Sequence, residues 1–364
     1  MFKPGISVKP AVAPASLPDC VISDHAVNVA RRSSASLPDC VLTDHAVSVA
    51  RRGPASLRVS RVLLSLVTLL ASVTPIAVSA QTLDNAPAAV RARLAARIAE
   101  VPGAQVAIAV QDPGSARGIA INGDTLFHAA STMKVPVLFA LFREFEQGRM
   151  RPDETLRLEN RFFSIVDRSP YTLNASDDSD STVYTLVGTD VPLKDLATRM
   201  ITHSSNLATN ALIGRLDAVR ITSITRELGA TRMQVLRGVE DNLAFRAGLN
   251  NTTTANDLVA LFVALYRGKV ANATSTRDML AILEAQAFND EIPAGLPPGT
   301  RVAHKTGSIT ATLHDAGLVY PPGRAPYAIA VLTRNIPDQK TAARLIADCS
   351  RIVWEWLVMS TTGR

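Results

Sequence analysis

Residues 127–134 read FHAASTMK, and the apolar run of residues 135–142 follows them directly. Apolar residues at this density are typical of a buried helix. Ser131 and Lys134 are three positions apart, which places hydroxyl and amine on one helix face. Ser131 would stand at the helix N-terminus, where free N–H groups and the helix dipole favour negative charge. The stretch predicts a serine nucleophile with a lysine base, provided that the environment lowers the lysine pKa well below about 10.4.

The scarcity of lysine singles out Lys134. Of 38 Lys and Arg residues, only seven are lysine. Arginine cannot release its proton in a protein, so it cannot act as a base. Two of the seven, Lys134 and Lys305, lie in motifs that combine lysine with a serine or threonine. A serine and a lysine at this spacing are still most often an exposed, solvated pair, so the pattern needs support from other motifs.

The net charge gives no sign of a nucleic-acid partner. The chain has 364 residues, is 47% hydrophobic and carries a net charge of +6. Residues 1–80 hold eight of the 38 Lys and Arg and four of the 32 Asp and Glu, which leaves 30 against 28. The remainder is therefore almost neutral and has the composition of an ordinary globular protein.

The chain begins with a tandem repeat. Residues 15–32 and 35–52 match each other at a 20-residue period with three differences. Two units are too few to bury a solenoid core by stacking. We interpret residues 1–57 as an extension outside the mature protein, translated from upstream of a true start near Leu57 or Val59.

Residues 58–80 have the pattern of a secretory signal peptide. A basic start, an apolar run and small residues up to Ala80 follow one another in that order. The uninterrupted apolar stretch is too short for a stable membrane span. We therefore expect the mature domain to comprise residues 81–364 and to be periplasmic or secreted.

The mature region predicts an α/β (α+β) fold with one antiparallel sheet. Strand patterns recur near both ends of the chain, whereas residues 151–247 are mostly helix and loop, with 174–182 as an exposed insertion. We expect a five-stranded sheet flanked by the terminal helices, an inserted all-helical lobe, and a site in the cleft between them. The expected strands are 105–110, 117–121, 301–306, 313–320 and 327–333, and the expected helices outside the lobe are 87–98, 253–267, 276–286 and 338–359.

Two further motifs carry polar groups suited to acyl transfer. Ser204 and Asn206 could point the same way from a loop or helix start and offer a proton-shuttling hydroxyl and an amide. Lys305-Thr306-Gly307 lies on an expected strand, where Lys305 supplies positive potential and Gly307 permits close approach of a substrate backbone. Each motif alone is weak, because a serine cluster is commonly a helix cap and short strand tripeptides occur by chance.

Together and in this order, the three motifs resemble those of the penicillin-recognising serine enzymes, the class A β-lactamases and D,D-peptidases. Phe127 and the threonines 252–254 look closest to the class A branch, and the resemblance covers roughly residues 83–357. It implies that Ser131 is the acylated nucleophile and that Lys134 is its base or proton relay.

The same resemblance implies roles for the other motif residues. Ser204 would pass a proton to the leaving nitrogen, and Asn206 would hold a substrate amide. Lys305 and Thr306 would recognise a substrate carboxylate. The oxyanion hole would consist of the backbone N–H groups of Ser131 and Ser308.

The sequence departs from the class A pattern at three places. Ser205 stands where an aspartate is usual. The expected deacylating glutamate is Glu240, with Asp241 as competitor, but the Leu-Asn pair that should follow closely is found only at residues 249–250. His314 and Asp315 occupy the strand region where an arginine often assists carboxylate binding, and His314 is the candidate to replace that arginine.

The sequence as a whole predicts an exported serine acyl-enzyme hydrolase that opens the amide bond of β-lactams. The substrate would be a β-lactam or an acyl-D-Ala-D-Ala-like small molecule, and the protein would be a monomer without metal or cofactor, since its histidines form no paired zinc signature. One alternative is a D,D-peptidase or esterase-like relative. Another is a non-hydrolytic penicillin-binding receptor that stays acylated.

Overall fold

The computed structural model describes residues 85–115 and 117–359. The repeat-containing segment 1–57 and the expected signal segment 58–80 lie outside the described residues. No helix in the described part of the chain has the length and apolar character needed to cross a membrane.

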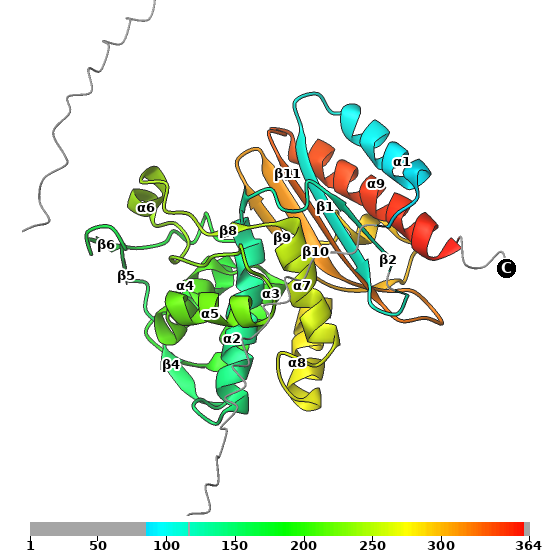
Figure 1. Ribbon diagram of the computed structural model, residues 1–364. Coiled ribbons are helices and arrows are strands. Elements are labelled where there is room, and N and C mark those ends of the chain that lie inside the picture. Colours follow the sequence, from blue (N-terminus) through cyan, green and yellow to red (C-terminus); the bar gives the residue numbers. More distant parts are fainter. Residues whose placement is uncertain (1–84, 116, 360–364) are drawn as a thin grey trace, which may run out of the picture. The chain divides into compact units, whose positions relative to one another are not determined.

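A five-stranded antiparallel sheet combines strands from both ends of the domain, as the sequence predicts (Figure 1). Its order is β2-β1-β11-β10-β9, so the last strand of the chain lies at the centre. In the central pair, Gln105 lies opposite Arg334 and Val110 opposite Ile329. The strands are β1 (Gln105–Asp112), β2 (Arg117–Ile121), β9 (Arg301–Ile309), β10 (Thr312–Tyr320) and β11 (Tyr327–Arg334).

The two faces of the sheet carry side chains of different size. Successive side chains in a strand point to opposite faces. On one face alanines such as Ala109 and Ala330 pack against the helical lobe. On the other face larger residues such as Ile108 and Val331 pack against the terminal helices α1 (Ala88–Ala99) and α9 (Gln339–Leu357). The alanine face leaves room for helix α7 (Ala255–Tyr266) to lie close to β1, β10 and β11 (Figure 1).

Helix α2 (Lys134–Glu146) forms the axis of the helical lobe, and every residue from Lys134 to Phe142 is buried. Residues that are apolar on all sides favour such a central position. The other helices of the lobe are α3 (Leu193–Thr202), α4 (Asn206–Leu216), α5 (Ala218–Glu227), α6 (Asn242–Arg246) and α8 (Ala273–Glu284). Short antiparallel strand pairs join its loops: β3 (Phe127–His128) with β8 (Thr252–Thr253), β4 (Thr155–Arg157) with β7 (Asp190–Pro192), and β5 (Phe162–Phe163) with β6 (Pro170–Tyr171).

The expectation that residues 174–182 form an exposed insertion holds for most of the segment, including Asp177, but is wrong for Asp178 and Asp180. Asp178 and Asp180 are buried. Asp180 accepts a 2.8 Å hydrogen bond from Arg199 on α3, and Asp178 contacts the start of α4. These two carboxylates bind the lobe, whereas most of the other polar side chains of the segment are exposed.

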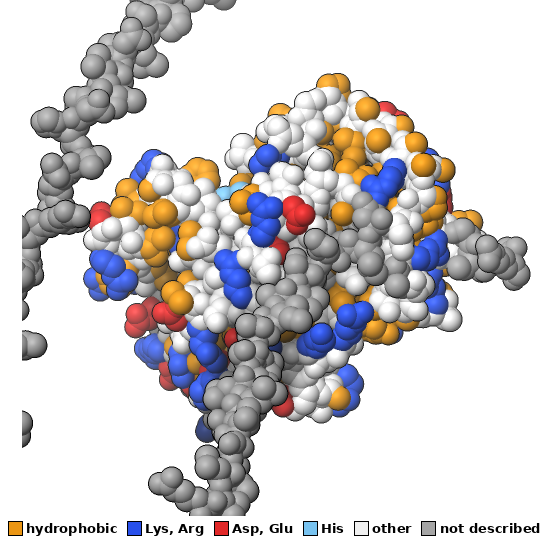
Figure 2. Space-filling view, viewed as in Figure 1, with side chains coloured by type: hydrophobic (Ala, Val, Ile, Leu, Met, Phe, Trp, Pro, Cys, Tyr) orange, Lys and Arg blue, Asp and Glu red, His pale blue; other side chains and the backbone are white. Residues whose placement is uncertain are grey.

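Apolar side chains are exposed on the helical lobe around β5 and α6 (Figure 2). Phe163 is 45% exposed and Phe245 is 51% exposed. Phe245 belongs to α6 and also lines a cavity at the cleft between lobe and sheet. The patch therefore adjoins the region to which the sequence motifs point.

Candidate active site

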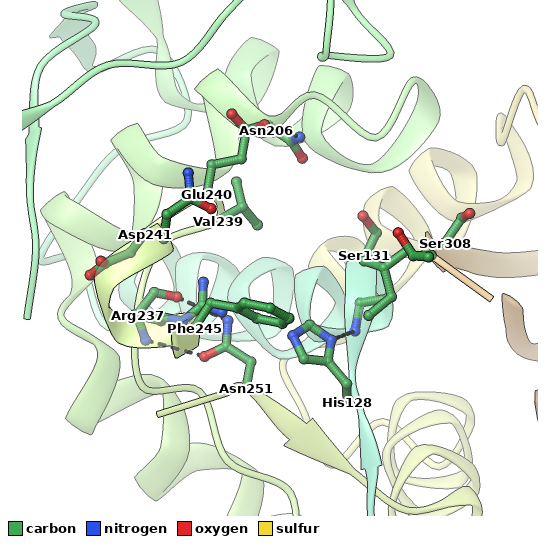
Figure 3. A pocket seen from close by; sticks show the side chains of 14 residues that line it. His128, Ser131, Asn206, Arg237, Val239, Glu240, Asp241, Phe245, Asn251 and Ser308 are labelled. Atoms are coloured by element: carbon green, nitrogen blue, oxygen red, sulfur yellow. Dashed lines mark hydrogen bonds between the residues drawn. The ribbon is translucent and has the colours of Figure 1, made fainter. Parts of the chain in front are cut away.

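The motif residues meet at two adjoining cavities between the sheet and the helical lobe. One cavity, of about 390 Å³, is lined by Asn206 and Glu240, and the other, of about 310 Å³, by Ser204 and Thr306. Ser131 and Ser308 line both. Figure 3 shows the first cavity, with Ser131 and Ser308 on one side and Glu240 and Asn206 on the other.

Ser131 lies in a short 3-10 turn, η1 (Ala130–Met133), that leads into α2. Ala130 has a positive φ of 45°, an unusual conformation for a residue with a Cβ. Its N–H donates to His128 Nδ1 at 3.0 Å, which helps to hold this turn. Strained backbone of this kind is often found at functional sites, where the surrounding structure maintains it.

Strand β9 passes very close to the backbone at Ser131. A Cβ atom on Gly307 would lie 3.0 Å from Ser131 N and 3.0 Å from Thr132 N. A side chain at position 307 would therefore push this backbone away, so only glycine fits. The close approach expected at Gly307 is an approach of the chain's own backbone at Ser131 and Thr132. The contact brings Ser308, the next residue on β9, beside Ser131 at the cavity they share.

Lys134 is fully buried and its amine is surrounded by oxygen atoms. Its Nζ lies 2.6 Å from Ser204 O, 3.1 Å from Ser204 Oγ and 2.9 Å from Asn206 Oδ1. Burial, reinforced by the nearby charge of Lys305, holds the pKa of Lys134 well below its usual value. A neutral amine has two N–H groups, and here they donate hydrogen bonds to Ser204 O and Asn206 Oδ1. Its lone pair then remains available to take a proton from a hydroxyl.

Asn206 joins the lysine to the glutamate. Its Oδ1 accepts from Lys134, and its Nδ2 donates to Glu240 Oε1 at 2.9 Å. Asn206 is the first residue of α4, and the buried Ser205 caps that helix by accepting from Ala208 N at 3.2 Å. The expectation that Ser204 and Asn206 would share one region at a helix start matches this geometry.

Asp178 holds the same helix start from a distant part of the chain. Its carboxylate accepts from Asn206 N at 2.9 Å and from Leu207 N at 2.9 Å. Sequence reasoning missed this residue, because nothing in the polar segment 174–182 marks one aspartate as buried. A carboxylate thus contacts the second motif even though position 205 is a serine.

Glu240 faces the first cavity from a loop that two asparagines hold in place. Asn210 accepts from Val239 N at 2.6 Å and donates to Val239 O at 3.0 Å. Asn251 accepts from Arg237 N and donates to Arg237 O. Glu240 itself has a positive φ of 62°. Burial raises the pKa of Glu240 above its ordinary value, although the hydrogen bond from Asn206 opposes this.

Asp241 is not free to compete with Glu240 for the cavity. It is 1% exposed, and its oxygens accept from Ser164 Oγ at 2.8 Å, Ile165 N at 2.9 Å and Ala244 N at 3.0 Å. These bonds cap α6 and attach the loop to the lobe. Asp241 also lines the first cavity, but these bonds occupy its carboxylate, which favours Glu240 as the base.

The Leu-Asn pair at residues 249–250 has a separate role. Leu249 O and Asn250 Oδ1 both accept from the guanidinium of Arg237. The residues that follow Glu240 closely include Leu243 and then Ala244, whose side chain is only a methyl group. No amide therefore stands directly after that leucine.

The third motif supplies a buried amine and two hydroxyls. Lys305 is fully buried, and its Nζ donates to Thr306 O at 2.9 Å. Burial lowers the pKa of Lys305 to about 7, while the carboxylates of Asp315 and Glu291 oppose the shift. Thr306 and Ser308 line the second cavity beside Ser131.

His314 is not available to bind a substrate carboxylate, contrary to expectation. The side chain is fully buried, and burial lowers its pKa to about 4. A neutral imidazole has one N–H, which Nε2 donates to His128 O at 2.9 Å, leaving Nδ1 to accept from Thr333 N at 3.2 Å. His314 thus links β10 to the strand before Ser131.

The described residues, 85–115 and 117–359, contain no group of three or more His, Cys, Asp or Glu side chains arranged to hold a metal ion. The chemistry available at the cleft is that of a buried amine, several hydroxyls and the carboxylate of Glu240, which lines the same cavity as a serine at a helix start. These groups can activate a hydroxyl nucleophile and, from the other side, a water molecule.

Known proteins are similar to this chain in sequence and in fold. The β-lactamase enzyme family matches residues 89–357. β-Lactamase AST-1 of Nocardia asteroides is 32% identical over 71% of this chain and 81% of its own length. The structure of PBP-A is 26% identical with a TM-score of 0.64, covering 75% of this chain and 97% of that one.

A second solved structure of PBP-A, of the L158E mutant, is an acyl-enzyme complex with penicillin G. It is 26% identical with a TM-score of 0.62, covering 73% of this chain and 95% of that one. These likenesses extend over the sheet, the helical lobe and the cleft between them. The chain belongs to the β-lactamase enzyme family and is a serine β-lactamase-like hydrolase.

Proposed function

We propose that the protein is an exported hydrolase of class A type that opens β-lactams through an acyl-enzyme on Ser131. The observation that carries this proposal is the connected set of polar groups from Lys134 through Asn206 to Glu240, beside the serine at the start of α2. It gives two different proton acceptors access to one ester, as a two-step hydrolysis requires.

In the first step the Ser131 hydroxyl attacks the lactam carbonyl and Lys134 takes its proton. The C–N bond of the lactam breaks as the ester forms, and the leaving nitrogen receives a proton through Ser204. The N–H groups of Ser131 and Ser308 stabilise the negative oxygen of the tetrahedral intermediate. The low pKa of Lys134 and the contact between Gly307 and Ser131 N support these roles.

In the second step Glu240 takes a proton from water, whose oxygen attacks the ester carbonyl. The bond between that carbon and Ser131 Oγ then breaks, and the proton on Glu240 is returned to Ser131 Oγ. Glu240 lines the cavity together with Ser131, so water in that cavity can lie between carboxylate and ester. Burial raises the pKa of Glu240 above its ordinary value, which makes the carboxylate a stronger base than an exposed glutamate.

One observation favours a second candidate, a penicillin-binding receptor that stays acylated. The side chain after Leu243 is a methyl group, so the amide expected near Glu240 to help place the water is missing from that position. The likeness to PBP-A, which also covers most of this chain, supports the same alternative.

Hydrolysis of a chromogenic cephalosporin by the purified protein tests the proposal. Steady turnover that disappears in Ser131→Ala supports it, and a single burst without turnover supports the receptor. Absence of any acylation in the parent protein would contradict both. The intact mass of protein recovered from the periplasm tests export, which predicts Gln81 as the first residue.

A further inference from the structure

The second cavity carries its own set of charges on the side of Ser131 that Glu240 does not line. Its walls include the hydroxyl side chains of Ser131, Ser204, Thr306 and Ser308. Three charged side chains also line it, and they are Asp290, Glu291 and Lys340. A substrate whose carbonyl lies at Ser131 must place its leaving-group half near these groups, because the first cavity provides the water.

The position of Lys340 is fixed by the start of α9. The preceding residue, Gln339, lies 3.4 Å from Ser308 Oγ and donates from Nε2 to Ile309 O at 3.2 Å. Asp338 caps the helix, because its carboxylate accepts hydrogen bonds from both the N–H and the hydroxyl of Thr341. These contacts attach the first turn of α9 to the end of β9, and Lys340 projects at the cavity edge.

The other cations near Ser131 are committed elsewhere. Arg237, in the first cavity, donates to three oxygen atoms of its own and neighbouring loops. Lys305 is fully buried and donates to Thr306 O, and His314 is buried and neutral. Lys340 is exposed, and no ion pair of its side chain occurs among the described residues.

We propose that Lys340 binds a carboxylate on the leaving-group half of the substrate, together with the hydroxyls of Thr306 and Ser308. This inference rests on the proposed function, in which the substrate is a β-lactam or an acyl-D-Ala-D-Ala-like molecule bearing such a carboxylate. Lys340 takes the place that an arginine beside the third motif would fill and that His314 cannot.

The acidic neighbours leave the charge of Lys340 effective at neutral pH. Burial, with the charges of Asp315 and Asp290, raises the pKa of Glu291 to about 8, so its carboxyl is mostly protonated there. Asp290 is exposed and therefore well solvated, and so is Asp338, whose carboxylate is near enough to interact with Lys340. The cavity then offers one ammonium group and several hydroxyl donors to an anion.

The test compares benzylpenicillin with its methyl ester, which lacks the carboxylate charge. The second-order rate constant for acylation is measured by intact mass for the parent, Lys340→Ala, Lys340→Arg and Lys340→Glu. Loss of a charged hydrogen bond at an open site predicts a roughly five- to tenfold decrease for Lys340→Ala with benzylpenicillin and less than about twofold with the ester. Lys340→Arg should stay near the parent, and Lys340→Glu should lose more than Lys340→Ala.

Lys269→Ala is the matched control, since Lys269 is an exposed lysine far from these cavities, and it should acylate like the parent. If Lys340→Ala lowers the acylation rate equally for benzylpenicillin and its ester, or for neither, the role of Lys340 is overturned while the proposed function stands. A parent protein that benzylpenicillin does not acylate would overturn the proposed function, and this inference with it.

Discussion

Lys134 shows at the scale of a single residue how burial changes the chemistry of a side chain. An exposed lysine is protonated at neutral pH and has no lone pair to offer. Inside the lobe, desolvation and the charge of Lys305 favour the neutral amine, and two oxygens fix its N–H groups. The remaining lone pair is the feature that an arginine cannot reproduce.

Lys134→Arg should therefore lower the acylation rate by roughly 10²- to 10⁴-fold, the contribution of a general base. The guanidinium stays protonated and therefore cannot accept the proton of Ser131. Labelling by a fluorescent penicillin, followed in time, measures the effect. Lys194→Arg, on the exposed side of α3, is the control and should label like the parent. Acylation of Lys134→Arg at the parent rate would show that the lysine is only structural.

Glu240→Gln should acylate normally and then accumulate the acyl-enzyme, because the amide cannot take a proton from water. Its deacylation rate should fall by roughly 10²- to 10⁴-fold. Intact mass shows the trapped adduct on Ser131 directly. The matched variant is Glu159→Gln, an exposed glutamate that lines neither cavity. Equal turnover in Glu240→Gln and the parent would remove Glu240 from the mechanism.

At the scale of elements, the site depends on how helix α4 begins. Asp178 binds the N–H groups of Asn206 and Leu207, and Asn206 in turn contacts both Lys134 and Glu240. The carboxylate near a helix N-terminus also interacts favourably with the helix dipole. Loss of this one side chain should therefore disturb both the helix start and the connection between the two proton acceptors.

Asp178→Ala should lower the free energy of unfolding by about 1–2 kcal/mol, the usual effect of a lost cap or buried hydrogen bonds. Without Asp178, Asn206 should move from its position beside Lys134, and this displacement should reduce the acylation rate by roughly ten- to hundredfold. Thermal unfolding and penicillin labelling measure the two effects. The neighbouring Asp177 is exposed, so Asp177→Ala should change neither. A destabilised Asp178→Ala with full acylation would show that the aspartate stabilises the helix alone.

The sequence predicts the secondary-structure elements and the motif residues far better than it predicts the residues that hold the motif residues in place. The expected strands 301–306 and 313–320 lie within β9 and β10, which extend them by a few residues, and Ser131 and Lys134 follow from spacing on one helix. Asp178 could not be found in this way, because its partners at α4 lie 28 and 29 positions along the chain. The burial of His314 is equally long-range, since its Nε2 partner is 186 positions away.

At the scale of the whole molecule, the buried acid Glu291 links stability to pH. Its pKa is about 8 in the folded protein, against about 4.3 in an unfolded chain. The folded state therefore binds more protons than the unfolded state between these pH values. Its contribution makes the free energy of unfolding fall as pH rises through this range, and the fall is complete above pH 8.

Glu291→Gln should remove this dependence. The melting temperature of the variant should match that of the parent near pH 4 and exceed it increasingly up to pH 8, by roughly 2–4 °C for each kcal/mol. Thermal unfolding across this pH range measures the difference, with Glu159→Gln as the control that should show none. A constant difference at every pH would mean that the buried carboxyl does not titrate as inferred.

The place of β11 at the centre of the sheet has a consequence for the order of folding. At one end of the β1–β11 pair, Arg334 Nε donates a hydrogen bond to the side chain of Gln105, which lies 229 positions earlier in the chain. Closing so long a loop is entropically unfavourable and makes folding slow. A nascent chain cannot complete this sheet before its last strand has been synthesised. In the exported protein that we propose, such a topology would delay the compact state until almost the entire chain has been synthesised.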